Sequence, residues 1–297
     1  YVQEVKRGND DKAREILRDT LIFPEILGRI CSAPCEAKCH RGQVGDGAVA
    51  ARAIKRYLTE GQEVEDIPVP ETGAATGKRV AVVGSGPAGL QAAYDLRLSG
   101  HEVVVFESGE KPGGMMRWAI PEFRLPEEVL DRELSQLERL GVQFRCGVVL
   151  GEDPSLKDVS REFDAVIVAA GCPRTVGLNI EGEQLDGVYS GLEVLKAGRL
   201  GGDLSLSGSL VVIGGGNVAV DSAQVALRLG ADRVTVVTLE GAEDMPAFPE
   251  EVSNAGSAGI DFEHSWGPLR FFGERGRVSG VELQHCTAVF SAGGAFE

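Results

Sequence analysis

Two glycine-rich turns constrain the fold of this chain more than any other feature. The first lies in "RVAVVGSGPAGLQAAYDLRLSGHEVVVFES", where a β-branched run over residues 79–83 leads into a turn and then a helix to about residue 99. A second strand over 102–106 ends at Glu107. The turn glycines are Gly84, Gly86 and Gly89. This setting predicts a βαβ unit that binds a dinucleotide, with the pyrophosphate at the helix N-terminus and the acid on a ribose.

The second turn lies in "SLVVIGGGNVAVDSAQVALRLGADRVTVVTLE" and repeats the pattern. Its key residues are Gly214, Gly216 and Ala219, with alanine in the permitted third position. A strand over 233–238 follows the helix and leads to Glu240. Two such turns in one chain predict two dinucleotide pockets, and the simplest pairing that passes electrons between them is a nicotinamide with a flavin.

The composition is that of a globular protein with room for more than one domain. The chain has 297 residues, of which 43% are hydrophobic and 25% are charged. Its net charge of −15 argues against a nucleic-acid or anionic-membrane partner, because like charges repel. No apolar run approaches the roughly 20 residues of a membrane span. We therefore expect no membrane span. The cysteine pattern is not that of a secreted disulfide framework, so we expect a cytoplasmic location.

Three cysteines lie close together in "GRICSAPCEAKCHRG", at Cys31, Cys35 and Cys39. A cluster this dense indicates a metal site, and most such sites need four ligands. One alternative is a tetrahedral zinc site completed by His40, although zinc motifs favour shorter spacing between paired cysteines. A second alternative is that an incomplete ligand set binds no metal. The other cysteines, which we expect to be buried structural thiols in strand-like stretches, are Cys146, Cys172 and Cys286.

The chain divides into four predicted regions. Residues 1–61 form a helical domain in which helices in "DDKAREILRDT" and "DGAVAARAIKRYLTEG" flank the cysteine loop, the second helix being capped by Asp46. Residues 62–77 form a linker with prolines and glycines. Residues 78–190 form one nucleotide-binding domain and residues 191–297 another. The chain opens without methionine and stops soon after a strand-like run, so we expect both ends to be cuts through a longer polypeptide.

Six segments, in order along nearly the whole chain, carry a family resemblance. They are "FPEILGRICSAPCEAKCHRG", "VAVVGSGPAGLQAA", "PGGMMRWAIPEFRLP", "VIVAAG", "VVIGGGNVAVDSA" and "EDMPA". The chain resembles the FAD-dependent pyridine-nucleotide oxidoreductases of the glutamate synthase small-subunit type, and also the N-terminal half of dihydropyrimidine dehydrogenase. The resemblance implies an α/β protein with a helical iron–sulfur domain followed by two Rossmann-like domains, the nicotinamide domain being inserted in the FAD domain.

The resemblance also implies cofactor contacts residue by residue. For FAD these are Gly84, Ser85, Gly86, Pro87, Ala88, Gly89, Glu107, Gly114, Met115, Arg124, Val149, Ala170 and Gly171, the valine lying in "GVVLGED", which resembles the family's adenine-side strand. For NAD(H) they are Gly214, Gly215, Gly216, Asn217, Val218, Ala219 and Asp221. For a [4Fe-4S] cluster they are Cys31, Cys35 and Cys39, with the other ligands outside this sequence. In a two-cluster ferredoxin, one cysteine of a motif can ligate the other cluster.

The implied activity is that of an electron-transfer flavoprotein subunit. It oxidises NADH through FAD and passes electrons by way of iron–sulfur clusters to an electron-accepting protein subunit, so we expect a hetero-oligomer. Hydride transfer needs no side-chain acid or base, so we assign no catalytic residue. One alternative is a non-enzymatic subunit whose FAD is structural. A thioredoxin-reductase-like enzyme would need two cysteines separated by two residues in the nucleotide domain, and the sequence has no such pair there.

The choice between NADH and NADPH depends on a departure from the family. NADPH-using relatives carry a pair of arginines where this sequence has Leu239 and Glu240, in "VVTLEGAEDMPA". A carboxylate at this place accepts hydrogen bonds from ribose hydroxyls but repels a 2′-phosphate, and Arg233 lies at the other end of the strand. The sequence therefore predicts NADH, unless Glu240 points to solvent and the pocket is indifferent.

Overall fold

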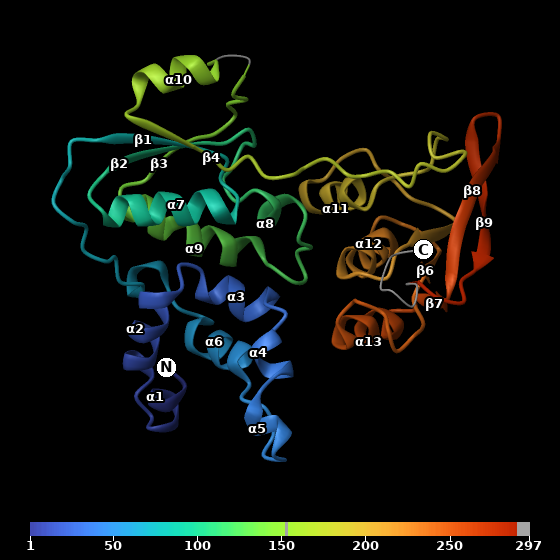
Figure 1. Ribbon diagram of the computed structural model, residues 1–297, viewed down its shortest axis with the longest axis horizontal. Helices are drawn as coiled ribbons and strands as arrows, with labels where there is room; N and C mark the ends of the chain where they lie inside the picture. Colours follow the sequence, from blue (N-terminus) through green and yellow to red (C-terminus); the bar gives the residue numbers. More distant parts are fainter. Residues whose placement is uncertain (152–153, 290–297) are drawn as a thin grey trace. The chain divides into compact units, whose positions relative to one another are not determined.

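The computed structural model describes residues 1–151 and 154–289 (Figure 1). The chain forms two compact units, Tyr1–Cys172 and Pro173–Glu297. Each unit contains a parallel sheet with helices packed on it, which confirms the predicted α/β class. Among the described residues, no helix is both long enough and apolar enough to cross a membrane.

The first unit opens with a series of short helices. They are α1 (Val2–Lys6), α2 (Asp10–Thr20), α3 (Pro24–Ile30), α4 (Pro34–Ala37), α5 (His40–Gln43), α6 (Ala51–Thr59) and the 3₁₀ turn η1 (Val64–Asp66). Helix α2 has two aspartates in its first turn and Arg18 in its last, so charges at both ends complement the helix dipole. Its inner side buries Ala13 and Leu17 against Leu58 of α6. The cysteine loop begins where α3 ends and continues through α4.

The predicted cap of the helix after the cysteine loop is wrong. Helix α6 starts at Ala51 with Ala50 at its N-cap position, and no side chain caps it. Asp46 lies four residues earlier, in a bend that follows α5, and irregular residues separate it from the helix. The aspartate cannot reach the free N–H groups of the first turn from there.

The sheet of the first unit is built around the first glycine turn. Its strands are β1 (Arg79–Val83), β2 (Glu102–Phe106), β3 (Gln143–Arg145) and β4 (Ala165–Val168), all parallel in the order β3-β2-β1-β4. The helices are α7 (Pro87–Leu98), α8 (Met115–Trp118), α9 (Glu127–Arg139) and α10 (Leu156–Glu162). Helix α10 lies on one face of the sheet and helices α7 and α9 on the other (Figure 1).

Alternation along the strands explains why both faces of this sheet are covered. Val82, Val103 and Val105 pack in the core formed with α7 and α9. Ala81 and Val104, the intervening residues, pack on the other side in the core formed with α10. A strand that is buried on both faces has a nearly continuous run of apolar residues, as β1 and β2 do after their first residues, Arg79 and Glu102.

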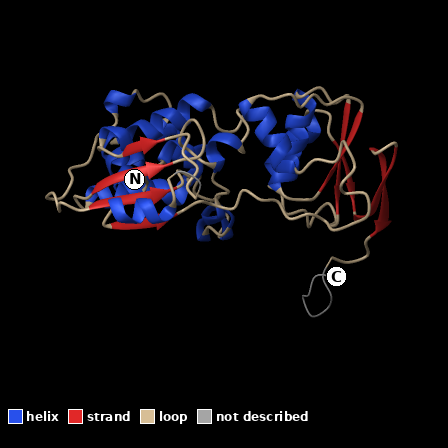
Figure 2. Ribbon diagram, turned by 90° about the horizontal axis from the view of Figure 1, so that it is seen from above, coloured by secondary structure: helices blue, strands red, loops and turns tan. Residues whose placement is uncertain are grey.

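The second unit repeats the strand–turn–helix pattern with fewer strands. Its parallel strands are β5 (Ser209–Ile213), β6 (Arg233–Thr238) and β7 (Asp261–His264), in the order β5-β6-β7. Helices α11 (Gly191–Leu200), α12 (Asn217–Arg228) and α13 (Pro249–Ser257) lie on one side of the strands (Figures 1 and 2). An antiparallel hairpin of β8 (Trp266–Glu274) and β9 (Arg277–His285) lies on the other.

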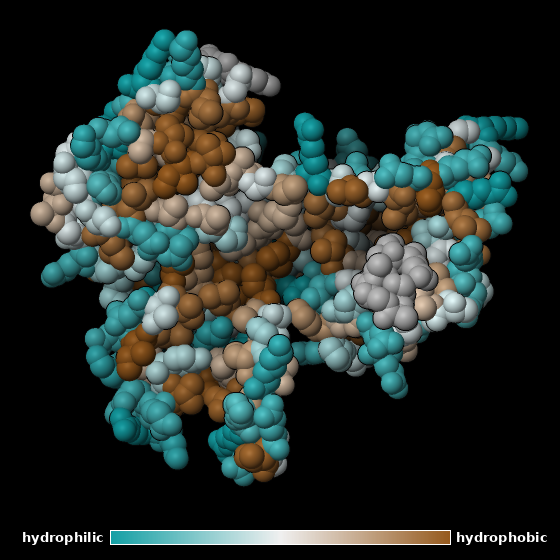
Figure 3. Space-filling view, in the orientation of Figure 1, coloured by the Kyte–Doolittle hydropathy of each residue, from teal (hydrophilic) through white to brown (hydrophobic). Residues whose placement is uncertain are grey.

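One edge of each parallel sheet carries exposed apolar side chains. Strand β4 pairs with β1 and strand β5 pairs with β6, and neither has a second neighbour within the described part of the chain. Ile167 and Val168 of β4 are 36% and 64% exposed, and Val211 of β5 is 45% exposed. Figure 3 shows hydrophobic side chains gathered beside α10, the region of β4.

Buried charges join the helical region to the nucleotide-binding part of the first unit. Glu25 of α3 is fully buried and accepts hydrogen bonds from Arg132 of α9, at 3.0 Å from Nε and 2.8 Å from Nη2. Glu133 of α9 is also fully buried, 3.4 Å from the guanidinium of Arg18. Burial raises the pKa of Glu133 to about 7, against the opposing effect of Arg18. One oxygen of Glu133 has no hydrogen-bond partner.

Two further sequence expectations are corrected by the structure. The three isolated cysteines are not buried: Cys172 is exposed and Cys146 and Cys286 are half-buried, because each lies beyond the end of a strand and not within one. The segment resembling an adenine-side strand is not a strand over 147–151, since β3 ends at Arg145; its residues 152–153 lie outside the described residues. Residues 290–297 of the predicted terminal segment also lie outside them.

Candidate dinucleotide and iron–sulfur sites

The first glycine turn is packed too tightly for side chains at two of its three glycines. Gly84 has a φ of +99°, and a methyl group placed there would lie 2.4 Å from the carbonyl oxygen of Ala169. A methyl group on Gly89 would lie 1.9 Å from the carbonyl oxygen of Gly84. A methyl group on Gly86 would meet no atom within 4 Å, so the N-terminus of α7 is open at this point. That opening, beside exposed Pro87 and Ala88, is where a pyrophosphate could approach the backbone.

Glu107 stands directly after β2 and faces the turn. Its Oε2 accepts hydrogen bonds from the backbone N–H of Ser85, at 3.0 Å, and from the Ser85 hydroxyl. Its Oε1 accepts from the backbone N–H of Gly109, at 2.8 Å, and from the Ser108 hydroxyl, at 3.2 Å. Burial alone would raise the pKa of Glu107, but these hydrogen bonds, led by that of Ser85, lower it below its ordinary value. The side chain is therefore a fixed carboxylate beside the turn.

Several predicted flavin contacts gather around the same turn. Gly114 has a φ of +53°, and a methyl group on it would lie 2.7 Å from Cα of Gly86. The N–H of Val148 donates to the backbone carbonyl of Glu107 at 2.9 Å, and the half-exposed Val149 follows it in sequence. Ala169, whose N–H donates to Val83 at 2.8 Å, leads into the exposed pair Ala170 and Gly171. Met115 begins α8, and Arg124 is half-buried in the segment before α9.

The second glycine turn is anchored by the loop that follows β6. The side-chain oxygen of Asn217, the first residue of α12, accepts from the backbone N–H of Phe248 at 2.8 Å. The N–H of Ala247 donates to the carbonyl of Gly215 at 2.9 Å. A methyl group on Gly216 would meet no atom within 4 Å, and Val218 is 53% exposed, so the start of α12 is open. Ala219 and Asp221 are buried on the inner side of the helix.

Glu240 lies against this turn and does not extend away from it. A methyl group on Gly215 would lie 2.6 Å from Oε2 of Glu240. The Glu240 carbonyl accepts from the Thr238 hydroxyl at 2.8 Å and from the N–H of Ser265 at 3.1 Å, which fixes the backbone there. Arg233 is engaged at the opposite end of β6, where its guanidinium lies 2.8 Å from Asp261.

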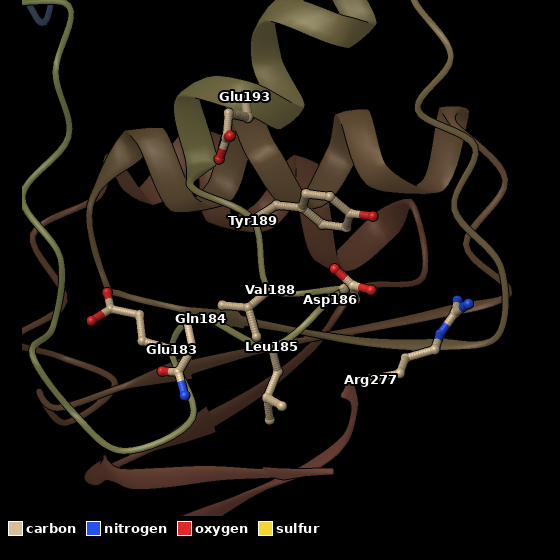
Figure 4. A pocket seen from close by; sticks show the side chains of 9 residues that line it. Glu183, Gln184, Leu185, Asp186, Val188, Tyr189, Glu193 and Arg277 are labelled. Carbon is tan, nitrogen blue, oxygen red and sulfur yellow. The ribbon is translucent and has the colours of Figure 1, made fainter. Parts of the chain in front are cut away.

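Two pockets open in the second unit. One, of about 830 Å³, runs along β5 and reaches the turn at Gly214, Gly216 and Val218. The other, of about 490 Å³, is polar and is shown in Figure 4. Two of its three acids hold local structure: Glu183 accepts from the N–H of Leu178 at 2.7 Å, and Glu193 accepts from the N–H of Ser190 at 2.7 Å. Of these two pockets, the one along β5 reaches the second glycine turn, and it is therefore the candidate for a dinucleotide.

The cysteine loop is attached to the helices on either side of it. Glu36 accepts from the N–H of Arg52 at 2.6 Å, and Arg52 donates to the carbonyl of Cys31 at 3.4 Å. A methyl group on Gly28 of α3 would lie 2.8 Å from the backbone nitrogen of Arg56, so α3 and α6 pack backbone to backbone. Ala33 adopts a left-handed φ of +51°, and its N–H donates to Sγ of Cys31 at 3.4 Å.

The three cysteines provide the right donor type but not a complete cage. All are free thiols, Cys35 exposed and Cys31 and Cys39 half-buried. Backbone hydrogen bonds, first from Val49 and then from Gly42 and Arg41, lower the pKa of the Cys39 thiol, which favours the thiolate that ligates metal. Within the described residues, however, no three His, Cys, Asp or Glu side chains are placed to hold one metal ion, whether as a zinc site with His40 or as a cluster.

Comparison with known proteins decides the family. The chain matches the sequence model of the pyridine nucleotide-disulphide oxidoreductases over residues 78–265, and that of dihydropyrimidine dehydrogenase domain II, 4Fe-4S cluster, over residues 1–67. The chain belongs to the pyridine nucleotide-disulphide oxidoreductase family. This is a family of oxidoreductases, and the two matches imply FAD, a nicotinamide dinucleotide and a 4Fe-4S cluster as cofactors. The predicted resemblance and cofactor classes are confirmed.

Three curated relatives illustrate the range of the family. The β subunit of NADP(+)-dependent formate dehydrogenase from Moorella thermoacetica is 33% identical over 95% of this chain. The PreT subunit of NAD-dependent dihydropyrimidine dehydrogenase from Escherichia coli (strain K12) is 31% identical over 95%. The small chain of glutamate synthase [NADPH] from the same strain is 33% identical over 95%. This chain spans 43%, 69% and 63% of their respective lengths.

Solved structures agree on the fold. FprA from Mycobacterium tuberculosis, in a variant form, superimposes with a TM-score of 0.63 at 20% identity, covering 74% of this chain and 66% of that one. At this identity the likeness concerns fold alone. The relatives named above include both NAD- and NADP-dependent proteins, so membership of the family leaves the choice of nicotinamide dinucleotide to the residues of this chain.

Proposed function

We propose that this chain is the NADH-oxidising flavoprotein part of an electron-transfer complex. In the proposal, FAD bound at the first glycine turn takes electrons from NADH bound at the second. The electrons then leave, by way of 4Fe-4S clusters partly ligated by the helical region, to an electron-accepting partner subunit. The observation that carries the proposal is the presence of two strand–turn–helix units, each with an acid just beyond its second strand, at Glu107 and Glu240.

The residues around the two turns have separate tasks in this proposal. FAD supplies the ability to accept a hydride and to release electrons singly, and the protein supplies binding and orientation. The open N-terminus of α7 receives the FAD pyrophosphate, and the carboxylate of Glu107 receives its ribose hydroxyls. The start of α12 receives the pyrophosphate of NADH in the same way. A methyl group on Gly171 would meet no atom within 4 Å, so this residue leaves backbone approachable beside the first turn, whereas Gly114 lets its segment pack against Gly86.

Glu240 is the residue on which NADH selectivity rests. Its carboxylate lies against Gly215, within the site that the glycine turn forms, and among the described residues Arg233 is occupied by Asp261 at the far end of the strand. A 2′-phosphate would therefore meet a negative charge that Arg233, the nearest cation in sequence, does not offset. We expect NADH to be preferred over NADPH by at least about tenfold in kcat/KM, which corresponds to about 1.4 kcal/mol.

Anaerobic stopped-flow mixing with NADH and NADPH tests the proposal directly. The unmodified chain, reconstituted with FAD, should lose its flavin absorbance with NADH at least about ten times more readily than with NADPH. The double variant Leu239→Arg, Glu240→Arg should move the preference toward NADPH, because a guanidinium pair can bind the extra phosphate. Flavin that is bound but not bleached by either nucleotide would instead identify a non-enzymatic scaffold.

The iron–sulfur assignment has its own test. We propose that Cys31, Cys35 and Cys39 each contribute to clusters whose other ligands lie outside residues 1–297. This agrees with thiols that are free yet do not converge on one ion. Cys35→Ser in the full-length protein, purified without oxygen, should lower the iron and sulfide content while flavin bleaching by NADH persists. Full iron and sulfide content in that variant would contradict the assignment.

A further inference from the structure

The side chain of Ser85 joins three separate segments at the first glycine turn. It is fully buried, one residue after Gly84. Its hydroxyl donates to Oε2 of Glu107 and accepts from the backbone N–H of Gly113 at 2.9 Å. The β1–α7 turn, the end of β2 and the glycine pair before α8 therefore meet at one oxygen atom.

The two oxygens of Glu107 are held differently. Both bonds to Oε2 come from Ser85, through its backbone N–H at 3.0 Å and its hydroxyl, and Ser85 is buried. Of the bonds to Oε1, one comes from the hydroxyl of Ser108, which is exposed and 3.2 Å away. A carboxylate offers about four acceptor positions, and here all four are used. A ribose hydroxyl can therefore bind only by replacing a donor, and Ser108 is the one free to rotate into solvent.

We propose that Ser85 is a positioning residue for FAD: it fixes Oε2 of Glu107 as a structural oxygen and leaves Oε1 for the ribose. This inference rests on the proposed binding of the FAD ribose by Glu107. The hydroxyl is required twice, as a donor to the carboxylate and as an acceptor from Gly113. An alanine at this position would leave the buried N–H of Gly113 without its partner.

The consequence is a dependence on pH. Burial raises the pKa of Glu107, and the hydrogen bond from the Ser85 hydroxyl is the largest of the interactions that lower it. Without that hydroxyl, the carboxyl takes up its proton at a higher pH. A protonated Glu107 no longer makes charge-assisted bonds to the ribose. Other charged or titratable groups on neighbouring elements are Cys146, after β3, and Arg117, whose side chain is held by Glu127 and Asp131. Loss of FAD on acidification should therefore follow Glu107.

The experiment measures FAD retention by flavin fluorescence from about pH 2.5 to 8, a range that extends below the ordinary carboxyl pKa, in the full chain reconstituted with FAD. Ser85→Ala should raise the midpoint for FAD loss by about one pH unit or more, since a hydrogen bond to a charged group is worth about 1.5–3 kcal/mol and one unit is 1.36 kcal/mol. Ser108→Ala, which removes a hydroxyl from the same carboxylate, is the matched control and should shift the midpoint by less than about 0.3 units. Ser85→Thr keeps the hydroxyl and should restore the original midpoint if it folds.

Two outcomes overturn the inference. One is an equal loss of FAD affinity at every pH in Ser85→Ala, and the other is a shift no larger than that of Ser108→Ala. Glu107→Gln separates this failure from failure of the flavin site itself. If Glu107→Gln retains FAD as well as the unmodified chain, Glu107 is not the ribose ligand and the proposed site falls with the inference. If Glu107→Gln loses FAD at all pH values, Glu107 is needed for FAD binding, and the midpoints of the Ser85 variants then show whether Ser85 positions it.

Discussion

The two glycine turns have the same strand–turn–helix pattern but differ in how the protein holds the glutamate beside each turn. In the first, Glu107 accepts four hydrogen bonds from protein donors and has a lowered pKa. In the second, the carboxylate of Glu240 lies against Gly215, and no donor from the described residues reaches it. The first site is organised before any ligand arrives, whereas the second acid is left to be satisfied by the ligand.

The first turn is also more tightly packed than the second. The third glycine position holds glycine in the first turn, where a methyl group would lie 1.9 Å from a carbonyl oxygen, and Ala219 in the second. Preorganisation favours tight, lasting binding because little remains to be ordered when the ligand arrives. The difference therefore suits a resident FAD in the first unit and an exchanging nucleotide in the second, as we propose.

Exchanging the residues at the third position should give the largest contrast. Gly89→Ala should destabilise the first unit by about 3 kcal/mol and abolish FAD binding, because its methyl group meets the backbone of Gly84. Ala219→Gly should cost only about 0.5–1 kcal/mol, as expected for glycine in a helix. Thermal unfolding and FAD content measure both. A well-folded, FAD-loaded Gly89→Ala would show that the first turn is no tighter than the second.

The next largest effect should be a pH dependence of the stability of the first unit. Glu133 has a pKa raised to about 7 when folded, so the folded state binds its proton more tightly than the unfolded state. Stability should be fully retained below the ordinary carboxyl pKa and fall as pH rises from about 4.5 to 7, by on the order of 3 kcal/mol. Glu133→Gln should remove that fall and stabilise the unit at pH 8.

Denaturant unfolding at pH 5 and pH 8 checks the Glu133 prediction. Glu128→Gln, a change at an exposed glutamate of the same helix, is the matched control and should leave the fall in place. If Glu133→Gln is less stable than the unmodified chain at pH 8, the contact of Glu133 with Arg18 outweighs burial and the prediction is wrong.

Replacing the two glutamates, Glu107 and Glu240, should give the smallest effects, and these effects should distinguish the FAD site from the NADH site. Glu107→Ala should weaken FAD binding at least about tenfold, because charge-assisted hydrogen bonds are lost. Glu240→Ala should leave FAD content unchanged and raise the KM for NADH by less than about tenfold, because its carboxylate is half-exposed. Dialysis followed by flavin quantitation, and steady-state kinetics with NADH, measure the two effects. FAD loss from Glu240→Ala would contradict the assignment of separate sites.

Local patterns made much of the nucleotide-binding fold predictable. The residues of β1, β2 and β6 are those expected from the sequence, since a β-branched run bounded by glycine or an acid fixes a strand within a few residues. The predicted cap at Asp46 failed because a cap depends on where the chain bends, and two glycines flank that residue. The cysteines at 146, 172 and 286 were misjudged because apolar neighbours in sequence did not place them inside strands.

The contacts that sequence reasoning missed join residues far apart in the chain. Ser85 was predicted as a cofactor contact, but its hydroxyl serves Glu107 and Gly113. Asn217 binds the backbone of Phe248, 31 residues away, and the buried pair Glu25 and Arg132 is separated by 107 residues. No periodicity or spacing reports such pairs. Glu133 lies among the apolar positions of an amphipathic helix, and this placement is a signal in the sequence that a charged side chain is buried.

The edges of β4 and β5 that have no partner strand in residues 1–151 and 154–289 affect how this chain behaves in concentrated solution. Both strands present exposed valines, and neither contains lysine or proline, the residues that usually keep a strand edge from adhering to another. The net charge of −15 provides the opposing force, because like-charged molecules repel at long range. Salt screens that repulsion and leaves apolar contact untouched. Added salt should thus drive this chain into assemblies that scatter light, whereas dilute buffer keeps its molecules apart.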